Sequence, residues 1–274
     1  MPKLALEISD PVAQTLLLPL HARLQEAGRP HPLVRDERAV RIASQLDYNA
    51  ASATMSAHDQ VATLLRLRQF DRRAQDFLRR TARPVVVHLG CGLDTRFDRL
   101  DDGRVRWVDL DLPEVIDLRR KLIGETARCR MLGRSALDPA WMDEVGRVKG
   151  PSCLFLAEGV LPYFEPAQVR WLVQTLHRRF PGSELVFDAL SPGMIRLHQV
   201  EIRRSRVSTL LQWGLAHPKE LEGWADGIRL LNAWYYFDEP EPRLGAMRLM
   251  RFIPFFARGV GVFHVKLGNP VAPS

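Results

Sequence analysis

The segment Val85-Val86-Val87-His88-Leu89-Gly90-Cys91-Gly92 joins a short apolar run to two closely spaced glycines. Consecutive valines followed by turn residues predict a buried strand of a parallel sheet. Glycines at the end of the strand let the backbone turn sharply and approach a ligand without a Cβ in the way, and the amides of a following helix point at that ligand. The segment therefore predicts an α/β fold with a ligand at this turn, although a tight turn alone would require the same two glycines.

The chain after residue 83 alternates short apolar runs with stretches of helical spacing, which is typical of crossover units in a parallel sheet. A helix is expected over residues 166–180, and a helical insertion over about 191–231 precedes the sixth strand. We therefore expect a doubly wound α/β fold with a seven-stranded, mostly parallel sheet. The expected strands cover residues 85–89, 105–110, 127–132, 153–157, 185–189, 233–237 and 261–267.

The first 82 residues show a different pattern. Apolar residues at helical spacing predict helices over residues 12–24 and 61–78. Residues 46–56 are rich in small and polar side chains, so we expect a mobile segment and a candidate lid. A chain of 274 residues commonly folds as one α/β domain. We expect a single domain, with residues 1–82 as a helical N-terminal extension and 83–274 as the core.

The composition restricts the functional class. No segment approaches the roughly 18 apolar residues of a membrane span, and no secretory signal is recognised, so we expect a soluble cytoplasmic protein. A net charge of +7 admits a nucleic-acid partner, but the basic residues are scattered beside helical apolar positions, which favours solvated helix faces. Cys91, Cys129 and Cys153 are too few and too irregularly spaced for a disulfide framework or a zinc site. We expect reduced thiols and no metal.

The segment Trp107-Val108-Asp109-Leu110-Asp111-Leu112-Pro113 supplies a second ligand signal. A carboxylate about 20 residues after the glycines can accept both ribose hydroxyls of an adenosine. Asp111 is the first candidate because it lies last in the strand, and Asp109 points the same way. The alternative is that Asp111 caps the helix that begins near Pro113.

Residue 95, three positions after the second glycine, is a threonine. The dinucleotide fingerprint requires a third glycine there, so Thr95 weakens the case for a nicotinamide cofactor. An NAD(P)-dependent oxidoreductase remains one alternative function. A non-catalytic RNA- or nucleotide-binding module, using the basic surface, is the other.

Three ordered motifs make a more specific case. The segments Val87-His88-Leu89-Gly90-Cys91-Gly92-Leu93-Asp94-Thr95-Arg96-Phe97, Asp109-Leu110-Asp111-Leu112-Pro113-Glu114-Val115 and Ala157-Glu158-Gly159-Val160-Leu161-Pro162-Tyr163-Phe164 resemble the leucine carboxyl methyltransferase family, with most likeness to bacterial tetracenomycin-type polyketide O-methyltransferases. The resemblance runs from about residue 10 to the C-terminus. It implies a Rossmann-like class I methyltransferase that uses S-adenosyl-L-methionine to methylate a carboxylate or hydroxyl oxygen of a small polyketide-like or aromatic acceptor.

The resemblance also implies site residues. Arg66 would pair with the methionine carboxylate of the cofactor, unless it is an ordinary surface arginine. Glu158 would lie near the amino and sulfonium groups, unless it merely caps the next segment. Ser135 and Ala136 would contact the adenine, with Ser135 standing where the eukaryotic leucine carboxyl enzymes carry Asp. The implied cofactor contacts are Arg66, Gly90, Gly92, Asp94, Asp111, Ser135, Ala136 and Glu158.

The acceptor side is less defined. A carboxylate acceptor is ionised near neutral pH and needs no general base, whereas a phenol would gain from one. His198 and His217 are candidate bases on the insertion, but their spacing selects neither, so no catalytic residue is assigned. Aromatic residues in the same half predict either an apolar acceptor pocket or ordinary core packing. They are Trp213, Trp224, Trp234, Tyr235 and Tyr236.

Overall fold

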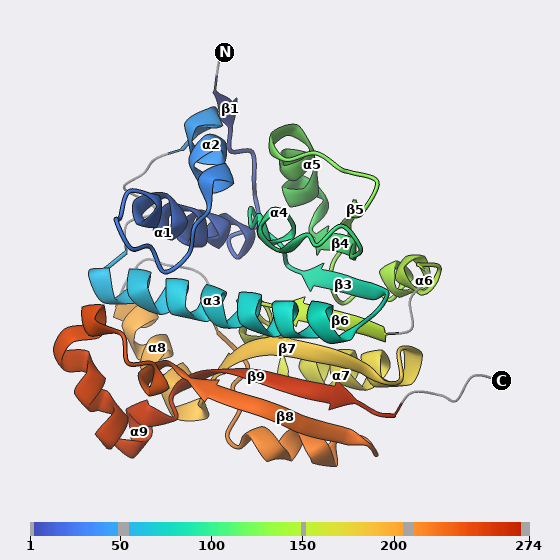
Figure 1. Ribbon diagram of the computed structural model, residues 1–274. Helices are drawn as coiled ribbons and strands as arrows, with labels where there is room; N and C mark the ends of the chain where they lie inside the picture. The colour runs from blue at the N-terminus through green and yellow to red at the C-terminus, as the bar shows by residue number, and fades with distance from the viewer. Residues whose placement is uncertain (1–2, 49–54, 149–151, 205–210, 270–274) are drawn as a thin grey trace.

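The computed structural model describes residues 3–48, 55–148, 152–204 and 211–269, which are built around a seven-stranded sheet (Figure 1). The strands follow the order β5-β4-β3-β6-β7-β9-β8, and only the pairings made by β9 are antiparallel. The predicted sheet is therefore confirmed. The strands are β3 (Pro84–Leu89), β4 (Arg106–Asp111), β5 (Cys129–Gly133), β6 (Ser152–Ala157), β7 (Ser183–Leu190), β8 (Ile228–Tyr235) and β9 (Val260–Leu267).

The strand order reverses between β3 and β6. From β3 the chain runs outward through β4 and β5, and it then returns to place β6 on the other side of β3. Leu89 pairs with Ala157, so the turns that leave these two strands lie side by side at the carboxyl edge of the sheet. Ligands of open α/β sheets bind beyond this edge at such a reversal.

Helices cover both faces of the sheet, because side chains along a buried strand alternate between the faces. Val87 packs in the cluster that contains α7 (Pro166–Arg179), and Val86 packs in the cluster that contains α3 (Ala57–Arg80). The side chain of Ser56 caps the first turn of α3. Other helices are α4 (Arg96–Leu100), α5 (Pro113–Leu122), α6 (Ala140–Gly146) and the 3-10 helix η3 (Leu161–Tyr163).

The N-terminal residues form a helical unit above α3, beside α4 and α5 (Figure 1). Its apolar side chains pack with Leu93, which follows β3, and with Val115 and Leu118 of α5. A Cβ built on Gly92 would lie 3.2 Å from the Cβ of Leu16, so the unit forms a wall against the glycine turn. Its elements are β1 (Leu4–Ala5), η1 (Ala13–Leu16), α1 (Leu17–Ala27), α2 (Glu37–Gln45) and β2 (Leu46–Asp47).

The two helical regions predicted near the N-terminus are confirmed by η1 with α1 and by α3. Helix α2 and the small parallel pairing of β1 with β2 were not predicted. Of the segment 46–56 that was expected to be mobile, residues 46–47 form β2 and residues 49–54 lie outside the described part of the chain.

The sixth strand and the insertion before it differ from the prediction. β8 begins at Ile228, so the strand takes up the last residues of the expected insertion. β8 is an edge strand with one partly exposed face, and polar residues such as Arg229 interrupt its apolar pattern. The aromatic residues at the end of β8 gave a stronger strand signal than the residues at its start, so the predicted strand began too late. The described part of the insertion is helical in α8 (Pro192–Arg204) and in η4 (Pro218–Gly223).

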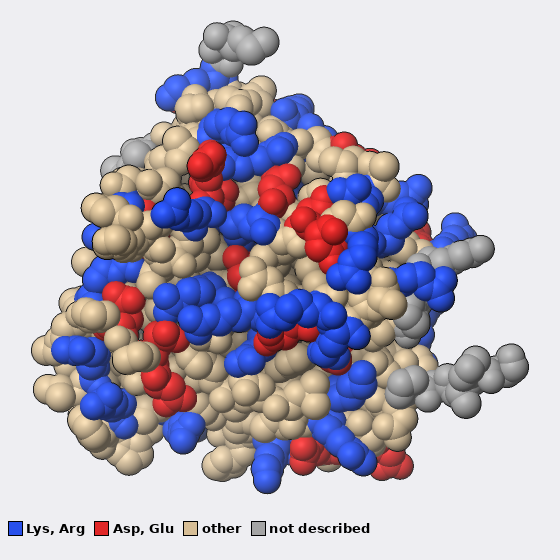
Figure 2. Space-filling model, in the orientation of Figure 1, with Lys and Arg blue, Asp and Glu red and all other residues tan. Residues whose placement is uncertain are grey.

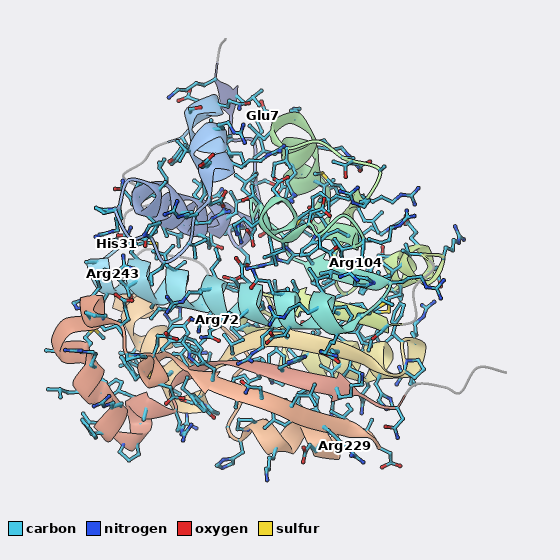
Figure 3. The ribbon with its side chains drawn as sticks, in the orientation of Figure 1. Glu7, His31, Arg72, Arg104, Arg229 and Arg243 are labelled. Carbon is cyan, nitrogen blue, oxygen red and sulfur yellow. The ribbon has the colours of Figure 1, made fainter. Side chains whose placement is uncertain are left out.

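Between β8 and β9 lie three short helices that the sequence pattern did not reveal. They are η5 (Tyr236–Asp238), η6 (Pro242–Phe252) and α9 (Pro254–Ala257). Arg243 of η6, labelled in Figure 3, donates from Nη1 to both carboxylate oxygens of Glu26 in α1 at 3.0 Å. This contact ties the C-terminal half to the N-terminal unit. Within the described ranges, none of the helices combines the length and apolar character that a membrane crossing requires.

Candidate functional site

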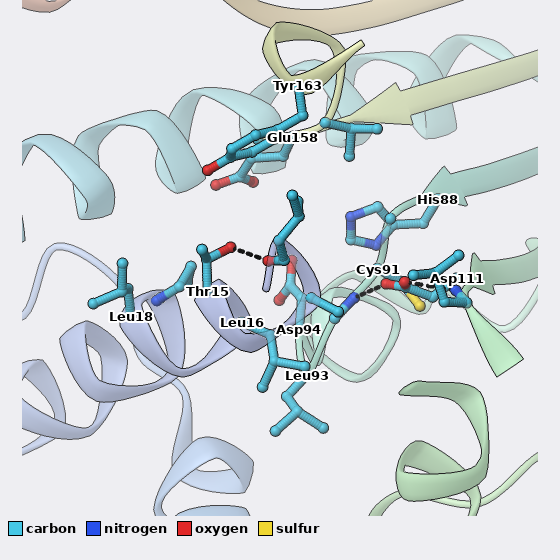
Figure 4. Close-up of a pocket in the computed structure, with 18 of the residues that line it drawn as sticks. Thr15, Leu16, Leu18, His88, Cys91, Leu93, Asp94, Asp111, Glu158 and Tyr163 are labelled. Atoms are coloured by element: carbon cyan, nitrogen blue, oxygen red, sulfur yellow. Dashed lines mark hydrogen bonds between the residues drawn. The ribbon is translucent and has the colours of Figure 1, made fainter. Parts of the chain in front are cut away.

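A cavity of about 510 Å³ lies beyond the carboxyl ends of β3, β4 and β6, and the N-terminal unit forms one of its walls (Figure 4). This volume is typical of small-molecule sites. The cavity occupies the place where strand order reverses, as the fold predicts. It is lined by all the residues that the sequence suggested as cofactor contacts, namely Arg66, Gly90, Gly92, Asp94, Asp111, Ser135, Ala136 and Glu158.

Both glycines of the turn are required by its geometry. Gly90 and Gly92 have φ values of 62° and 48°, in the left-handed region that side chains with a Cβ rarely adopt. The amide of Gly90 donates to the carbonyl of Leu110 at 2.8 Å, which ties the turn to the neighbouring strand. A Cβ on Gly90 would lie 2.3 Å from Cγ2 of Val160. The turn therefore brings bare backbone to the cavity.

Asp111 is held by backbone amides at the end of β4. Its Oδ2 accepts from the amide of Gly92 and its Oδ1 from the amide of Leu112, each at 2.7 Å. The N-cap residue of α5 is Leu112, without a side-chain cap, so the helix-capping alternative for Asp111 is wrong. Burial raises the pKa of Asp111. Asp109 points instead into a buried ion pair with Arg119.

Arg66 and Glu158 form an ion pair inside the site. Nε of Arg66 lies 3.0 Å from Oε1 of Glu158, and Nη1 of Arg66 lies 3.0 Å from Oδ2 of Asp188. Arg66 is therefore not an ordinary surface arginine. Glu158 pairs with Arg66 instead of capping the next segment. Sequence reasoning did not single out Asp188, which stands near the end of β7 and also accepts the amide of Gly159 at 2.6 Å.

The carboxylate of Asp94 forms ion pairs with three arginines. Arg96, Arg99 and Arg23 lie 2.8, 2.9 and 3.2 Å from its carboxylate oxygens. Burial alone would raise the pKa of Asp94, but Arg96, Arg99 and Arg23 hold it well below its usual range. Arg23 comes from α1 and also donates to the carbonyl of Leu93 at 3.0 Å. The glycine turn is thus bound to the N-terminal unit by charge as well as by apolar contact.

Ser135 and Ala136 follow β5 at the far side of the cavity. The Oγ of Ser135 accepts from the amide of Leu137 at 3.2 Å, and the carbonyl of Ala136 accepts from Nε1 of Trp141 at 3.1 Å. Their conformation is therefore fixed by α6 and the turn before it. Both residues line the cavity.

His88 lines the cavity and was not among the predicted site residues. Its Nε2 lies 3.2 Å from Nη1 of Arg96. Because arginine only donates, Nε2 accepts, which places the ring proton on Nδ1. Burial, followed by the charge of Arg96, lowers the pKa of His88 well below its usual value. With its accepting nitrogen occupied, this histidine is not available as a general base.

The N-terminal unit and η3 contribute cavity residues that sequence reasoning missed, among them Thr15, Leu16 and Tyr163. Burial raises the pKa of Tyr163. Tyr163 lies in the motif from Ala157 to Phe164, which therefore carried a signal for this residue. Thr15 and Leu16 lie in the helix predicted over residues 12–24 but gave no signal of a site, because only the fold brings η1 over the glycine turn.

The acceptor-side candidates lie elsewhere. Neither His198 nor His217 lines the cavity, and His217 is exposed at the N-cap of η4. The five aromatic residues considered for an acceptor pocket do not line it either; they are Trp213, Trp224, Trp234, Tyr235 and Tyr236. Trp213 packs against Phe187 and Trp224 with ring centroids 5.9 and 6.4 Å apart. Core packing is therefore the role that the structure gives Trp213.

Basic side chains on the face drawn in Figure 2 are interspersed with acidic ones. Arg79 pairs with Asp76 and Arg104 pairs with Asp102, and both arginines are at least half exposed. The positive charge of these two arginines is therefore compensated by surface ion pairs. The three cysteines are buried and form no disulfide.

Comparisons with known proteins identify the family of the chain. The family model for leucine carboxyl methyltransferase matches residues 6–177. The chain is 32% identical over 230 residues to the tetracenomycin polyketide synthesis O-methyltransferase TcmP of Streptomyces glaucescens, covering 84% of each chain. It is 30% identical over 241 residues to the S-adenosyl-L-methionine-dependent methyltransferase dpfgK of Gibberella zeae, covering 79% of each. A solved DUF574 family protein from Streptomyces avermitilis shares the fold, with a TM-score of 0.56 at 14% identity over 89% of this chain and 96% of that one.

The fold, the cavity and these relatives place the chain among the S-adenosyl-L-methionine-dependent methyltransferases. S-adenosyl-L-methionine is its cofactor, so the nicotinamide alternative is wrong. Within this class the chain belongs to the leucine carboxyl methyltransferase family, as its three motifs predicted.

Proposed function

We propose that this enzyme transfers the methyl group of S-adenosyl-L-methionine to an oxygen atom of a small polyketide-like or aromatic acceptor. The observation that carries the proposal is the cavity at the reversal of strand order, lined by all the predicted cofactor residues. The similarity to TcmP, which is an O-methyltransferase of polyketide synthesis, supports the choice of oxygen and of the acceptor class.

The chemistry of the lining residues fits the cofactor. Asp111, at the tip of β4, would accept the ribose hydroxyls, and Ser135 and Ala136 would flank the adenine. Gly90 would lie under the methionine portion, where its backbone lines the cavity and packs against the side chain of Val160. The remaining contacts of the turn, Gly92 and Asp94, would complete the floor of the cofactor site.

Arg66 and Glu158 would meet the charged end of the cofactor. A guanidinium group suits the methionine carboxylate, and a carboxylate favours the nearby ammonium and sulfonium charges. When bound, S-adenosyl-L-methionine supplies the methyl group and carries its own leaving group. The residues of this chain therefore need only align the acceptor oxygen and exclude water.

The N-terminal extension, residues 1–82, would serve as the cover of a single domain. Thr15 and Leu16 of η1 line the cavity, and Arg23 of α1 bonds to Asp94 and to the carbonyl of Leu93. Water exclusion at the reacting oxygen would depend on this cover staying in place.

The surroundings of the cavity favour an acceptor oxygen that is already ionised, such as a carboxylate. The nitrogen of His88 that could take a proton accepts from Arg96. The carboxylates that line the described cavity each accept from an arginine or from a backbone amide. A carboxylate acceptor, with a pKa of about 4, needs no base, whereas a phenol with a pKa of about 10 does.

Product analysis tests the acceptor. The enzyme would be incubated with the cofactor and with matched aromatic acids and phenols, and products would be screened by mass spectrometry for the gain of one methyl group. We expect the acids to react and their products to be cleaved by mild alkali, as methyl esters are. Methyl ethers formed from the phenols alone would contradict the preference for a carboxylate.

Calorimetric titration tests the cofactor site. Asp111→Ala and Glu158→Ala are each expected to weaken S-adenosyl-L-methionine binding without unfolding the protein. Asp117→Ala, on the exposed face of α5, serves as the control because the side chain of Asp117 is 66% exposed. Unchanged affinity in both site variants would remove Asp111 and Glu158 from the proposed site.

A further inference from the structure

Arg96 lies at the centre of a buried set of ion pairs beside the proposed cofactor site. Its Nη2 is 2.6 Å from Oε2 of Glu158, its Nη1 is 2.8 Å from Oδ2 of Asp94, and its Nε is 2.6 Å from Oδ1 of Asp71. The side chain of Arg96 is fully buried and does not line the cavity. Arg96 can therefore act on a bound cofactor only through the groups that it holds.

The charges around Glu158 alternate in sign along a chain of five side chains. Asp71 binds Arg96, Arg96 binds Glu158, Glu158 binds Arg66, and Arg66 binds Asp188. Each carboxylate oxygen of Glu158 thus has its own guanidinium group. A carboxylate held on both oxygens has a fixed plane and a fixed direction toward the cavity.

We propose that Arg96 is a positioning residue, which fixes the carboxylate of Glu158 toward the positive end of S-adenosyl-L-methionine. The inference rests on the proposed function, in which Glu158 meets that end of the cofactor. The planar guanidinium group of Arg96 reaches three carboxylates at once, whereas a lysine ammonium would supply the charge without the fork. Geometry rather than charge alone is therefore what Arg96 contributes.

Arg99 provides a matched control on the same short helix. Its side chain is 10% exposed, and it binds Asp94, Asp71 and Asp36 at 2.9 to 3.0 Å, but Glu158 is not among these partners. Arg96→Lys and Arg99→Lys therefore disturb similar buried carboxylates. The two variants differ in one respect, because Arg96 binds Glu158 and Arg99 does not.

Double-mutant cycles test the inference. Calorimetry would measure S-adenosyl-L-methionine binding to Arg96→Lys, Glu158→Gln and the double variant, and to the matching set with Arg99→Lys. We expect Arg96→Lys to weaken binding about tenfold in the natural chain and less than about threefold when Glu158 is already glutamine. The effect of Arg99→Lys should be the same in both backgrounds, because its partners do not include Glu158.

A second ligand separates positioning from loss of structure. S-adenosylhomocysteine lacks the sulfonium charge, so Arg96→Lys should reduce its affinity less than that of S-adenosyl-L-methionine. A purely structural role would weaken both ligands equally. Thermal denaturation would establish that each variant is folded during the titrations.

The outcomes are distinct. Equal effects of Arg96→Lys with and without Glu158, or an unchanged affinity in Arg96→Lys, would overturn the inference. If Arg96→Lys does not fold, Asp71→Asn replaces it, because Asp71 holds Nε of Arg96, and the same dependence on Glu158 is expected. Unchanged binding in Glu158→Gln alone would instead contradict the proposed function, which keeps the two failures separate.

Discussion

Two buried acidic residues of β7, Glu184 and Asp188, point to the same side of the strand but lie toward opposite edges of the sheet. Glu184 stands near the start of the strand. Its carboxylate binds Arg80, His264 and Lys266, with the closest His264 contact at 2.8 Å and the Lys266 contact at 3.4 Å. None of these four residues lines the cavity, and the three partners share the one carboxylate of Glu184.

Asp188 stands near the carboxyl end of β7, where the strand approaches the reversal of strand order. It accepts from the amide of Gly159 and from Arg66, and Arg66 in turn lines the cavity. The two carboxylates are alike in burial and in having cationic partners. Position along the strand distinguishes them, because only the carboxyl edge gives a buried ion pair access to a ligand.

Replacing Glu184 should have the largest effect, and it should fall on stability. Glu184→Gln leaves Arg80, His264 and Lys266 without their shared carboxylate, and we expect a loss of about 2 kcal/mol in the free energy of unfolding. The affinity for S-adenosyl-L-methionine should not change. Urea denaturation and calorimetry measure the two quantities, and a weakened affinity would mean that the two ends of β7 are coupled.

The contribution of Glu184 to the free energy of unfolding should depend on pH. Burial alone would raise its pKa, but hydrogen bonds from His264 and Arg80 lower the pKa of Glu184 to about 2. A group whose pKa is lowered by folding stabilises the protein above its unfolded pKa, and that contribution is lost as pH falls toward the folded value. The difference in unfolding free energy between the natural chain and Glu184→Gln should therefore narrow from pH 5 downward. A constant difference between pH 5 and pH 3 would contradict this linkage.

Short-range signals carried much of the site prediction. The glycine turn, Asp111 and Glu158 lie in continuous motifs, and each ends or follows a strand whose apolar run is buried on both faces, so their placement at the carboxyl edge could be read directly. The central strands were predictable for the same reason. The start of the edge strand β8 at Ile228 was not, because its exposed face breaks the apolar run.

The ion pairs could not be predicted, because they join segments that are distant in the sequence. Arg96 belongs to one of the quoted motifs, yet its partners Asp71 and Glu158 come from α3 and from the end of β6. Arg23 likewise lies in a helix with no visible site pattern and reaches Asp94 only in the folded chain. The fold decides which charges are buried together.

Asp188→Asn should have the opposite profile to Glu184→Gln. The amide keeps an acceptor for Gly159 but removes the charge that holds Arg66, so we expect S-adenosyl-L-methionine binding to weaken about tenfold, or about 1.4 kcal/mol. Unfolding free energy should change less than in Glu184→Gln, because the cavity gives Arg66 access to water. Titration and urea denaturation of both variants would decide. If Asp188→Asn lost more unfolding free energy than Glu184→Gln, the two ends of β7 would not differ in the way described.

Arg80→Gln should produce the smallest effect. The side chain of Arg80 is 48% exposed, whereas its partner Glu184 is only 2% exposed, and half-exposed arginines contribute little because water solvates them in either state. His264 and Lys266 remain to satisfy Glu184, so we expect a loss of less than about 1 kcal/mol in unfolding free energy, decreasing further in high salt. A loss as large as that of Glu184→Gln would show that Arg80 alone holds the cluster. Each end of β7 would then depend on a single ion pair. Glu184 would no longer differ from Asp188 in having several cationic partners that can replace one another.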